Sequence, residues 1–299
     1  MSAHDTTISR REFLRGAAGV TLAAATGLGP ALQAQEKPKF ATRVVLVRDA
    51  GVLDTDGRLS PSVVARMLDD AVVALFEAKD SATVWGRLVS SADIVGIKSN
   101  EWAKLPTPPE IEAVLKQRVL KTGVPEKNIS IGDRDVLDDP VFRRATALIN
   151  VRPLRTHHWS GIGGCIKNYV QFVPAPSEYH DEYCTPLGSI WNKDLVKGKT
   201  RLNILVVLHP LFHGIGPHHY DRSYSWRYCG ILVGIDPVAV DTIGLKLIAA
   251  KRREYFKEDR PLTPPAIHVA RADTTWGIGT SDLAKIELVK LGWPDGVLI

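Results

Sequence analysis

The chain has 299 residues, of which 44% are hydrophobic and 24% are charged, and its formal net charge is +5. This length allows one large α/β domain or two small ones with a sizeable core. The lysines and arginines form no run, so the composition argues against a nucleic-acid partner, while the sign of the charge suits a small anionic ligand.

The N-terminal segment has the order of a twin-arginine signal peptide. Arg10-Arg11 is followed by an apolar run, rich in alanine and glycine, at residues 16–32. This run is short and mildly hydrophobic for a helix that must cross roughly 30 Å of hydrocarbon. We therefore predict a signal peptide at residues 1–34, export by the twin-arginine translocase to the periplasm, and no permanent membrane anchor. The alternative is an amphipathic first helix with a chance Arg-Arg pair.

Three cysteines bear on cofactor content. The spacing of Cys165, Cys184 and Cys229 matches neither a zinc ribbon nor an iron–sulfur run, so we expect no iron–sulfur cluster. An oxidising compartment permits one disulfide, but buried and inert thiols are an equal alternative. Twin-arginine export favours a cofactor that is loaded before export, such as a divalent metal, without identifying it.

Strand-like and helix-like segments alternate after a polar, flexible lead-in at residues 35–42. The apolar runs are rich in Val, Ile and Leu, which is typical of strands covered on both faces. This alternation predicts a single α/β domain at residues 43–299, with a largely parallel sheet flanked by helices. The expected strands are 43–48, 93–98, 128–132, 147–151, 202–208 and 231–235, and the expected helices are 61–78, 108–121 and 237–255.

Residues 155–217 interrupt this alternation. They are rich in Gly, Pro, His and aromatic residues and have little periodicity. Long irregular stretches in such domains are usually active-site loops or lids. We therefore predict a long irregular Gly/His-rich insertion in the α/β domain.

Polar residues follow several of the predicted strands, where an open α/β sheet has its ligand crevice. Lys98 could hold a carboxylate or phosphate, and Asn100 could orient it, although a solvated strand end is an equal alternative. Asp133 could bind a metal or substrate, position a basic partner, or cap the following turn.

A glycine-rich segment repeats this Lys/Asn chemistry. Gly163 and Gly164 would let backbone N–H groups approach a ligand, and Lys167 and Asn168 follow them. The glycines match neither the Walker nor the dinucleotide fingerprint. His157, just before this segment, is a candidate metal ligand or proton carrier.

Histidines are concentrated in one part of the chain. Seven of the eight histidines beyond residue 34 lie at positions 157–219, without an HExxH motif. We predict metal ligands from separate loops at His157, His209 and His213, against the alternative of surface and hydrogen-bonded histidines. Further along the chain, Asp236 is the expected helix N-cap, and Asp241, about a turn later, is a catalytic candidate.

Together these segments resemble the bacterial family called domain of unknown function 362. The resemblance covers about residues 43–250 and implies the fold without implying a reaction. Some members carry a ferredoxin-like cluster segment, whose cysteines this chain lacks. The family usually has an acidic residue near the position of His209, which implies an altered ligand set here. The segments that carry the resemblance are 96–100, 107–110, 131–133, 163–168, 214–217 and 234–241, with His157.

These observations favour an exported enzyme that acts on a small anionic substrate. Lys98 and Lys167 would hold the anion, and the histidines, with Asp133 or Asp241, would bind a metal or move protons. An isomerase, a lyase or a hydrolase would suit such a site. The alternatives are a non-catalytic ligand-binding or metal-binding protein of the cell envelope and a redox accessory protein.

Overall fold

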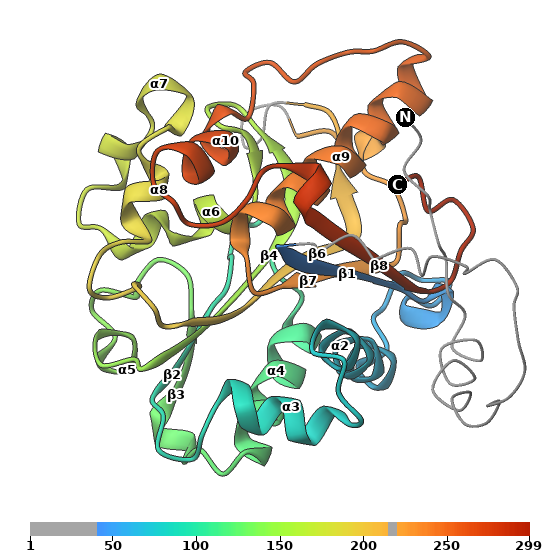
Figure 1. The fold of residues 1–299 in the computed structure, drawn as a ribbon. Coiled ribbons are helices and arrows are strands. Elements are labelled where there is room, and N and C mark those ends of the chain that lie inside the picture. The colour runs from blue at the N-terminus through green and yellow to red at the C-terminus, as the bar shows by residue number, and fades with distance from the viewer. Residues whose placement is uncertain (1–40, 215–219) are drawn as a thin grey trace, which may run out of the picture.

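A central sheet runs through the molecule with helices on both faces (Figure 1). The structure is a computed structural model that describes residues 41–214 and 220–299. The strand order is β3-β2-β4-β6-β7-β1-β8, and the short β5 pairs with β4. Along this path only the pairs formed by β7 are antiparallel, so the predicted largely parallel sheet is confirmed. The strands are β1 (Thr42–Arg48), β2 (Val95–Lys98), β3 (Ile129–Gly132), β4 (Ala147–His157), β5 (Gly161–Gly163), β6 (Thr200–Leu211), β7 (Gly230–Gly234) and β8 (Ile286–Gly292).

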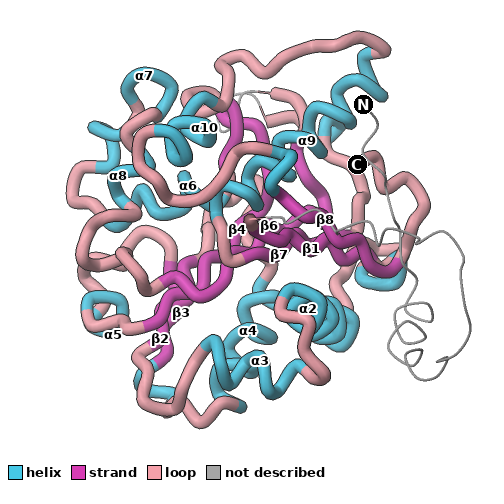
Figure 2. Tube along the Cα trace, viewed as in Figure 1, coloured by secondary structure: helices cyan, strands magenta, loops and turns pink. Residues whose placement is uncertain are grey.

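Two layers of helices enclose the sheet, as the tube view in Figure 2 shows. Helices α2, α3 and α4 cover one face, and α6, α8, α9 and α10 lie on the other. Along β1, Val44 and Leu46 belong to one buried cluster, and Val45 and Val47 belong to the other. Continuous apolar runs in this chain therefore mark strands buried on both faces. The helices are α2 (Pro61–Leu75), α3 (Ser81–Leu88), α4 (Pro109–Lys121), α5 (Pro140–Arg143), α6 (Cys165–Asn168), α7 (Asp181–Cys184), α8 (Leu187–Ile190), α9 (Pro237–Phe256) and α10 (Ile267–Thr274).

The predicted strands and helices are all present with shifted ends, but the long irregular insertion is not confirmed. Within 155–214 the chain forms the end of β4, strands β5 and β6, and several short helices, among them α6. Strand β4 continues to His157 instead of ending at Val151, because it stays paired with β6 as far as Arg155 and with β5 from Arg155 to His157. The predicted signal peptide and residues 35–40 of the lead-in lie outside the described residues, as do His218 and His219.

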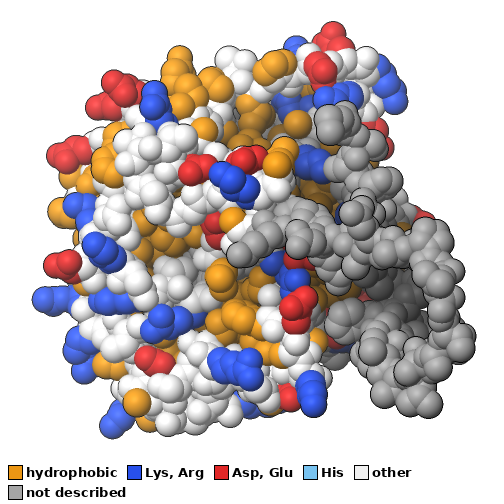
Figure 3. Space-filling model, viewed as in Figure 1, with side chains coloured by type: hydrophobic (Ala, Val, Ile, Leu, Met, Phe, Trp, Pro, Cys, Tyr) orange, Lys and Arg blue, Asp and Glu red, His pale blue; other side chains and the backbone are white. Residues whose placement is uncertain are grey.

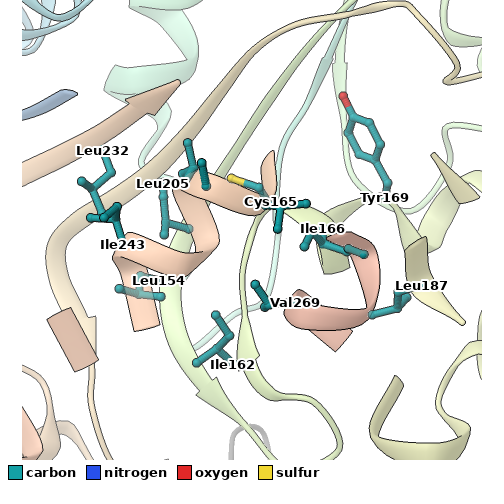
Figure 4. Packing of buried hydrophobic residues seen from close by; sticks show 14 of the residues in the cluster. Leu154, Ile162, Cys165, Ile166, Tyr169, Leu187, Leu205, Leu232, Ile243 and Val269 are labelled. Carbon is teal, nitrogen blue, oxygen red and sulfur yellow. The ribbon is translucent and has the colours of Figure 1, made fainter. Parts of the chain in front are cut away.

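Packing around α6 fixes the end of the sheet that carries the candidate site. Cys165 and Ile166 are fully buried in the cluster between the sheet, α9 and α10. In Figure 4 they lie between Leu205, Leu232 and Ile243 on one side and Leu187 on the other. A turn held by packing on both sides can present its polar residues in a fixed direction.

Two further properties concern the surface and the thiols. Charged side chains of both signs are dispersed over the face drawn in Figure 3. All three cysteines are free and buried, as one of the two alternatives predicted.

Across residues 41–214 and 220–299, no helix combines the length and apolar character that a membrane span requires.

Candidate functional site

A pocket of about 290 Å³ lies where the carboxyl ends of β2, β3 and β4 meet α6. This is the edge at which open α/β sheets bind ligands. The residues that line it come from segments far apart in the chain, and many of them are charged or aromatic. We call this cavity the charged pocket; its walls include Asn100, Trp102, Asp133, Arg155, His157 and Lys167.

Arg155 is the cation with the fewest partners in the charged pocket. It projects from β4, is only 5% exposed, and its guanidinium stacks on the Trp102 ring at 4.1 Å. Neither Nε nor Nη1 has a hydrogen-bond partner among the residues that the structure describes. Burial and the neighbouring Arg152 lower its pKa well below the usual value, yet a guanidinium remains protonated in proteins. A buried cation without a counter-charge is unstable unless an anion joins it.

Lys167 is a second buried cation that faces the same cavity. Its side chain is at the end of α6 and is 5% exposed, and Nζ lies 3.9 Å from Cys184 Sγ. Within 41–214 and 220–299, no carboxylate forms an ion pair with it. Burial lowers the pKa of this ammonium group to about 8, and Arg152 and Arg155 act in the same direction. Lys167 is therefore mostly charged at pH 7 and close to titration.

The two glycines predicted to approach a ligand make room for charged side chains. A Cβ on Gly163 would lie 2.6 Å from Arg152 Nη2, and a Cβ on Gly164 would lie 2.3 Å from Asp241 Oδ1. Arg152 Nη1 also donates to the Gly164 carbonyl at 3.2 Å. Glycine is therefore required here by close packing against Arg152 and Asp241, and the contact of these two glycines with a ligand stays a prediction.

Asp241 was a catalytic candidate, but its carboxylate is used to cap α6. Oδ1 accepts a hydrogen bond from the backbone N–H of Cys165 at 2.6 Å, and Oδ2 accepts one from Ile166 at 3.0 Å. The side chain is fully buried, and burial raises its pKa to about 6. Asp241 is thus a positioning residue that fixes the turn carrying Lys167 and Asn168.

Asp236 is the N-cap of α9, as predicted. Its carboxylate accepts hydrogen bonds from the backbone N–H groups of Val238 and Ala239.

Lys98 and Asp133 form a buried ion pair at the base of the charged pocket. Lys98 Nζ donates to Asp133 Oδ1 at 2.5 Å and to the Ser99 carbonyl at 2.7 Å. Asp133 Oδ2 accepts from the Glu101 backbone at 2.9 Å. Burial alone would raise the pKa of Asp133, but Lys98 and this hydrogen bond lower it, so the carboxylate stays ionised. Lys98 is fully buried and already paired, which differs from the predicted direct contact with substrate, whereas Asp133 positions a basic partner, one of its predicted alternatives.

His157 faces the charged pocket as a neutral ring. Its Nδ1 accepts the Trp159 backbone N–H at 3.2 Å, which places the ring proton of the neutral form on Nε2. Burial, Lys167 and Arg155 all lower its pKa strongly, which favours the neutral ring near neutral pH. In this arrangement His157 can donate from Nε2 to an anion, while its Nδ1 is occupied by the Trp159 backbone N–H.

Aromatic rings continue from His157 along the wall of the pocket. The His157 ring stacks on His158 at 4.7 Å, and Trp159 lies 4.1 Å from His158 and 4.2 Å from His180. Burial and Lys167 lower the pKa of His180 to about 4. The rings of Trp159 and His180 therefore add no positive charge to the pocket wall at pH 7.

Two asparagines complete the polar lining. Asn168 Nδ2 donates to Asn150 Oδ1, to the Lys98 carbonyl and to the Val151 carbonyl, at 2.8 to 3.2 Å. The buried Oδ1 atoms of Asn100 and Asn168 have no donor among the described residues. Both asparagines, predicted to bind substrate, therefore line the pocket with an oxygen that a ligand hydroxyl or amine could contact.

The structure does not bring the predicted metal ligands together. His213 Nδ1 lies 3.0 Å from Arg252 Nη1, and its ring packs on Tyr224 and Phe256. His209 lies apart from the charged pocket, beside Arg227, and burial lowers its pKa. Among residues 41–214 and 220–299, no group of three or more His, Cys, Asp or Glu side chains could hold a metal.

A larger cavity of about 490 Å³ lies between α2 and the strands β1 and β8. Two of its carboxylates are paired, Asp49 with Arg66 at 2.6 Å and Asp69 with Arg118 at 2.7 Å. Its buried cation, Arg48, donates to the backbone carbonyls of Tyr228, Trp293 and Asp295. The charged pocket is smaller, but among the described residues two of its buried cations, Arg155 and Lys167, form no ion pair, and Nε and Nη1 of Arg155 have no hydrogen-bond partner. The excess of buried positive charge makes the charged pocket the stronger candidate for a ligand site.

Sequence reasoning missed Arg152, Arg155 and Trp102. The available signal was two arginines and a proline that directly follow an apolar strand, at residues 152–155. A period-two strand pattern would place Arg152 and Arg155 on opposite faces, so their convergence is not predictable from alternation. The register shift between Pro153 and Arg155 in the β4–β6 pair accounts for the difference.

The sheet and the pocket define the chain as an α/β protein with a buried cationic pocket. Residues 113–246 match the family model described as Domain of unknown function (DUF362), which supports the resemblance inferred from the sequence. The matched segment includes Asp133, β4 and α6, whereas Asn100 and Trp102 precede it. Comparisons with curated proteins and with solved structures gave no match.

A methyl group at Gly164 tests the capping of α6. We expect Gly164→Ala to displace the Asp241 carboxylate and to lower the free energy of unfolding by roughly 1–3 kcal/mol, measured by urea denaturation. The matched control is Gly86→Ala in α3, where a Cβ meets nothing within 4 Å, so a gain of about 0.5–1 kcal/mol is expected. Equal effects of the two substitutions would contradict the capping role.

Lys167→Met tests whether the buried ammonium lacks a counter-charge. Without ligand at pH 7.5, the variant should exceed the wild type in unfolding free energy by about 1–3 kcal/mol, because a destabilising charge is removed. The folded-state pKa of about 8 lies below the ordinary 10.5, so the unfolded chain binds more protons between these values. The wild type therefore regains this stability as pH rises from 8 towards 10.

The stability difference between Lys167→Met and the wild type should accordingly narrow over that pH range. Tyr169 and Tyr228 are buried and titrate equally in the two proteins, so their effect cancels when the unfolding free energy of the wild type is subtracted from that of the variant. Lys246→Met, an exposed control on α9, should show no gain. A loss of stability in Lys167→Met at pH 7.5 would mean that Lys167 is compensated within the protein.

Proposed function

We propose that this protein binds a small oxyanion in the charged pocket. The observation that carries the proposal is Arg155, a buried guanidinium with two N–H groups that lack a partner among the described residues. Lys167 lies in the same pocket and also has no ion-pair partner there. An anion between the two groups would supply the missing counter-charge.

The donor geometry favours a carboxylate or a phosphoryl group over a halide. A guanidinium presents its donors in a rigid fork that matches two oxygens of one ligand group. Stacking on Trp102 limits rotation of this fork, and the Nε2–H of His157 adds a neutral donor. These features support an oxyanion with several acceptor oxygens.

Proton transfer by Lys167 is a second candidate function at the same pocket. The observation that favours it is the pKa of about 8, which leaves a useful fraction of neutral amine near physiological pH. Lys167 Nζ would take a proton from the carbon or the hydroxyl next to the bound oxyanion. In an isomerase, lyase or hydrolase, turnover would separate this function from simple binding. The separation of His157, His209 and His213 gives no support to metal-assisted chemistry.

We also propose that the protein acts outside the inner membrane after export in folded form. The support is the order of the N-terminal segment, in which Arg10-Arg11 precedes an uncharged, mildly apolar run. Folding before export would suit a pocket whose residues come from distant parts of the chain.

Phosphate binding tests the function of Arg155. At pH 7.5, phosphate at about 100 times its dissociation constant should stabilise the wild type by about 2.7 kcal/mol, and so raise the melting temperature by roughly 5–10 °C. Arg155→Gln should bind phosphate at least about tenfold more weakly, measured by calorimetric titration. The control Arg87→Gln, on the exposed side of α3, should bind like the wild type. Unchanged affinity in Arg155→Gln would overturn the assignment of the site.

Cell fractionation tests the export proposal. Replacing Arg10-Arg11 with Lys-Lys should leave the full-length precursor in the cytoplasm of a host with a twin-arginine translocase. Arg15→Lys is the matched control, because it changes an arginine outside the pair, and it should be exported normally. Periplasmic recovery of the Lys-Lys variant would contradict the proposed route.

A further inference from the structure

The buried groups around the charged pocket carry an excess of two positive charges. Four cations, Lys98, Arg152, Arg155 and Lys167, face two carboxylates, Asp133 and Asp241. Each of the six side chains is at most 7% exposed, so solvent screens them poorly. Arg134, which also lines the pocket, and Glu101, which follows Asn100 in the chain, are exposed and of opposite charge, so they leave this balance unchanged.

Neither carboxylate forms an ion pair with Arg155 or Lys167. Asp133 is bound to Lys98 and to the Glu101 backbone, and Asp241 is bound to the amides of Cys165 and Ile166. Arg152 lies close enough to both carboxylates for each to favour its charged form. Asp133 also favours the charged form of Arg155, but among the described residues it forms no ion pair with Arg155, and no carboxylate pairs with Lys167. Two carboxylates shared among four cations leave two positive charges in excess, and Arg155 and Lys167 both face the charged pocket.

We propose that the ligand of the charged pocket is a small dianion, either a dicarboxylate or a phosphate monoester. This inference rests on the proposed oxyanion-binding function and specifies its substrate class. A monoanion would neutralise one buried cation and leave the other without a counter-charge, whereas a dianion balances both. The pocket volume of about 290 Å³ limits the ligand to a small molecule.

Methyl phosphate and methyl sulfate form a probe pair that tests the charge requirement. They have closely similar shapes, but at pH 7.5 the phosphate monoester is mainly a dianion and the sulfate ester is a monoanion. In calorimetric titrations of the full chain, methyl phosphate should bind at least about tenfold more tightly. Lys167→Met should reduce this ratio to about twofold or less, while Lys246→Met should preserve it.

Succinate and succinamate provide the same test for a dicarboxylate. They differ by one charge at nearly constant size, so succinate should bind at least about tenfold more tightly than succinamate if the natural ligand is a dicarboxylate. If the dianion binds more tightly in the methyl phosphate and methyl sulfate pair but not in the succinate and succinamate pair, the natural ligand is a phosphate monoester. These wild-type comparisons do not depend on the folding of any variant.

The outcomes separate this inference from the proposed function. If monoanions bind as tightly as dianions in both pairs, and Arg155→Gln loses all of them, the pocket binds oxyanions but the dianion inference is wrong. If no probe binds to the wild type, the proposed function itself is wrong. A charge preference that persists unchanged in Lys167→Met would show that Lys167 does not contact the second charge, and would also overturn the inference.

Discussion

The carboxyl ends of β2, β3 and β4 are organised around buried positive charge that the protein does not fully compensate. Arg152 and Arg155 lie on β4, between β2 and β6, and are only 2% and 5% exposed. A charge held in this way destabilises the fold by several kcal/mol unless it is paired. The surrounding structure pairs only part of it, through Asp133 and Asp241. The remaining charge is concentrated at Arg155 and Lys167, which both face the charged pocket.

The supporting residues hold the pocket in place by connecting segments that are distant in sequence. Asp241 of α9 holds the amides of α6, and Asn150 of β4 contacts Asn168 of α6 and Asn203 of β6. Glycine at 164 is part of the same arrangement, because any side chain there would occupy the position of the Asp241 carboxylate. The direction of Lys167 is therefore set by buried hydrogen bonds, as preorganised binding requires.

The sequence predicted the sheet well because apolar runs buried on both faces leave a clear signal, as Val44 to Val47 in β1 illustrate. It did not predict β8, in which Glu287 and Lys290 interrupt the apolar run. The position of the site at the carboxyl ends of the strands was predictable, and Lys167, Asn168, Asn100 and His157 do line it. The division of roles was not predictable, because only tertiary contacts reveal that Lys98 and Asp133 neutralise each other.

Stability and function place opposite demands on Arg155 and Lys167. Apolar residues of similar volume at both positions would remove buried charge from a sheet and a turn that otherwise pack tightly, so folding alone gives no reason for these cations. Lys98 and Arg152 differ, since removing either would leave a buried carboxylate with fewer partners. This contrast between compensated and uncompensated cations within one cluster is the physical basis for assigning the first pair to structure and the second pair to a ligand.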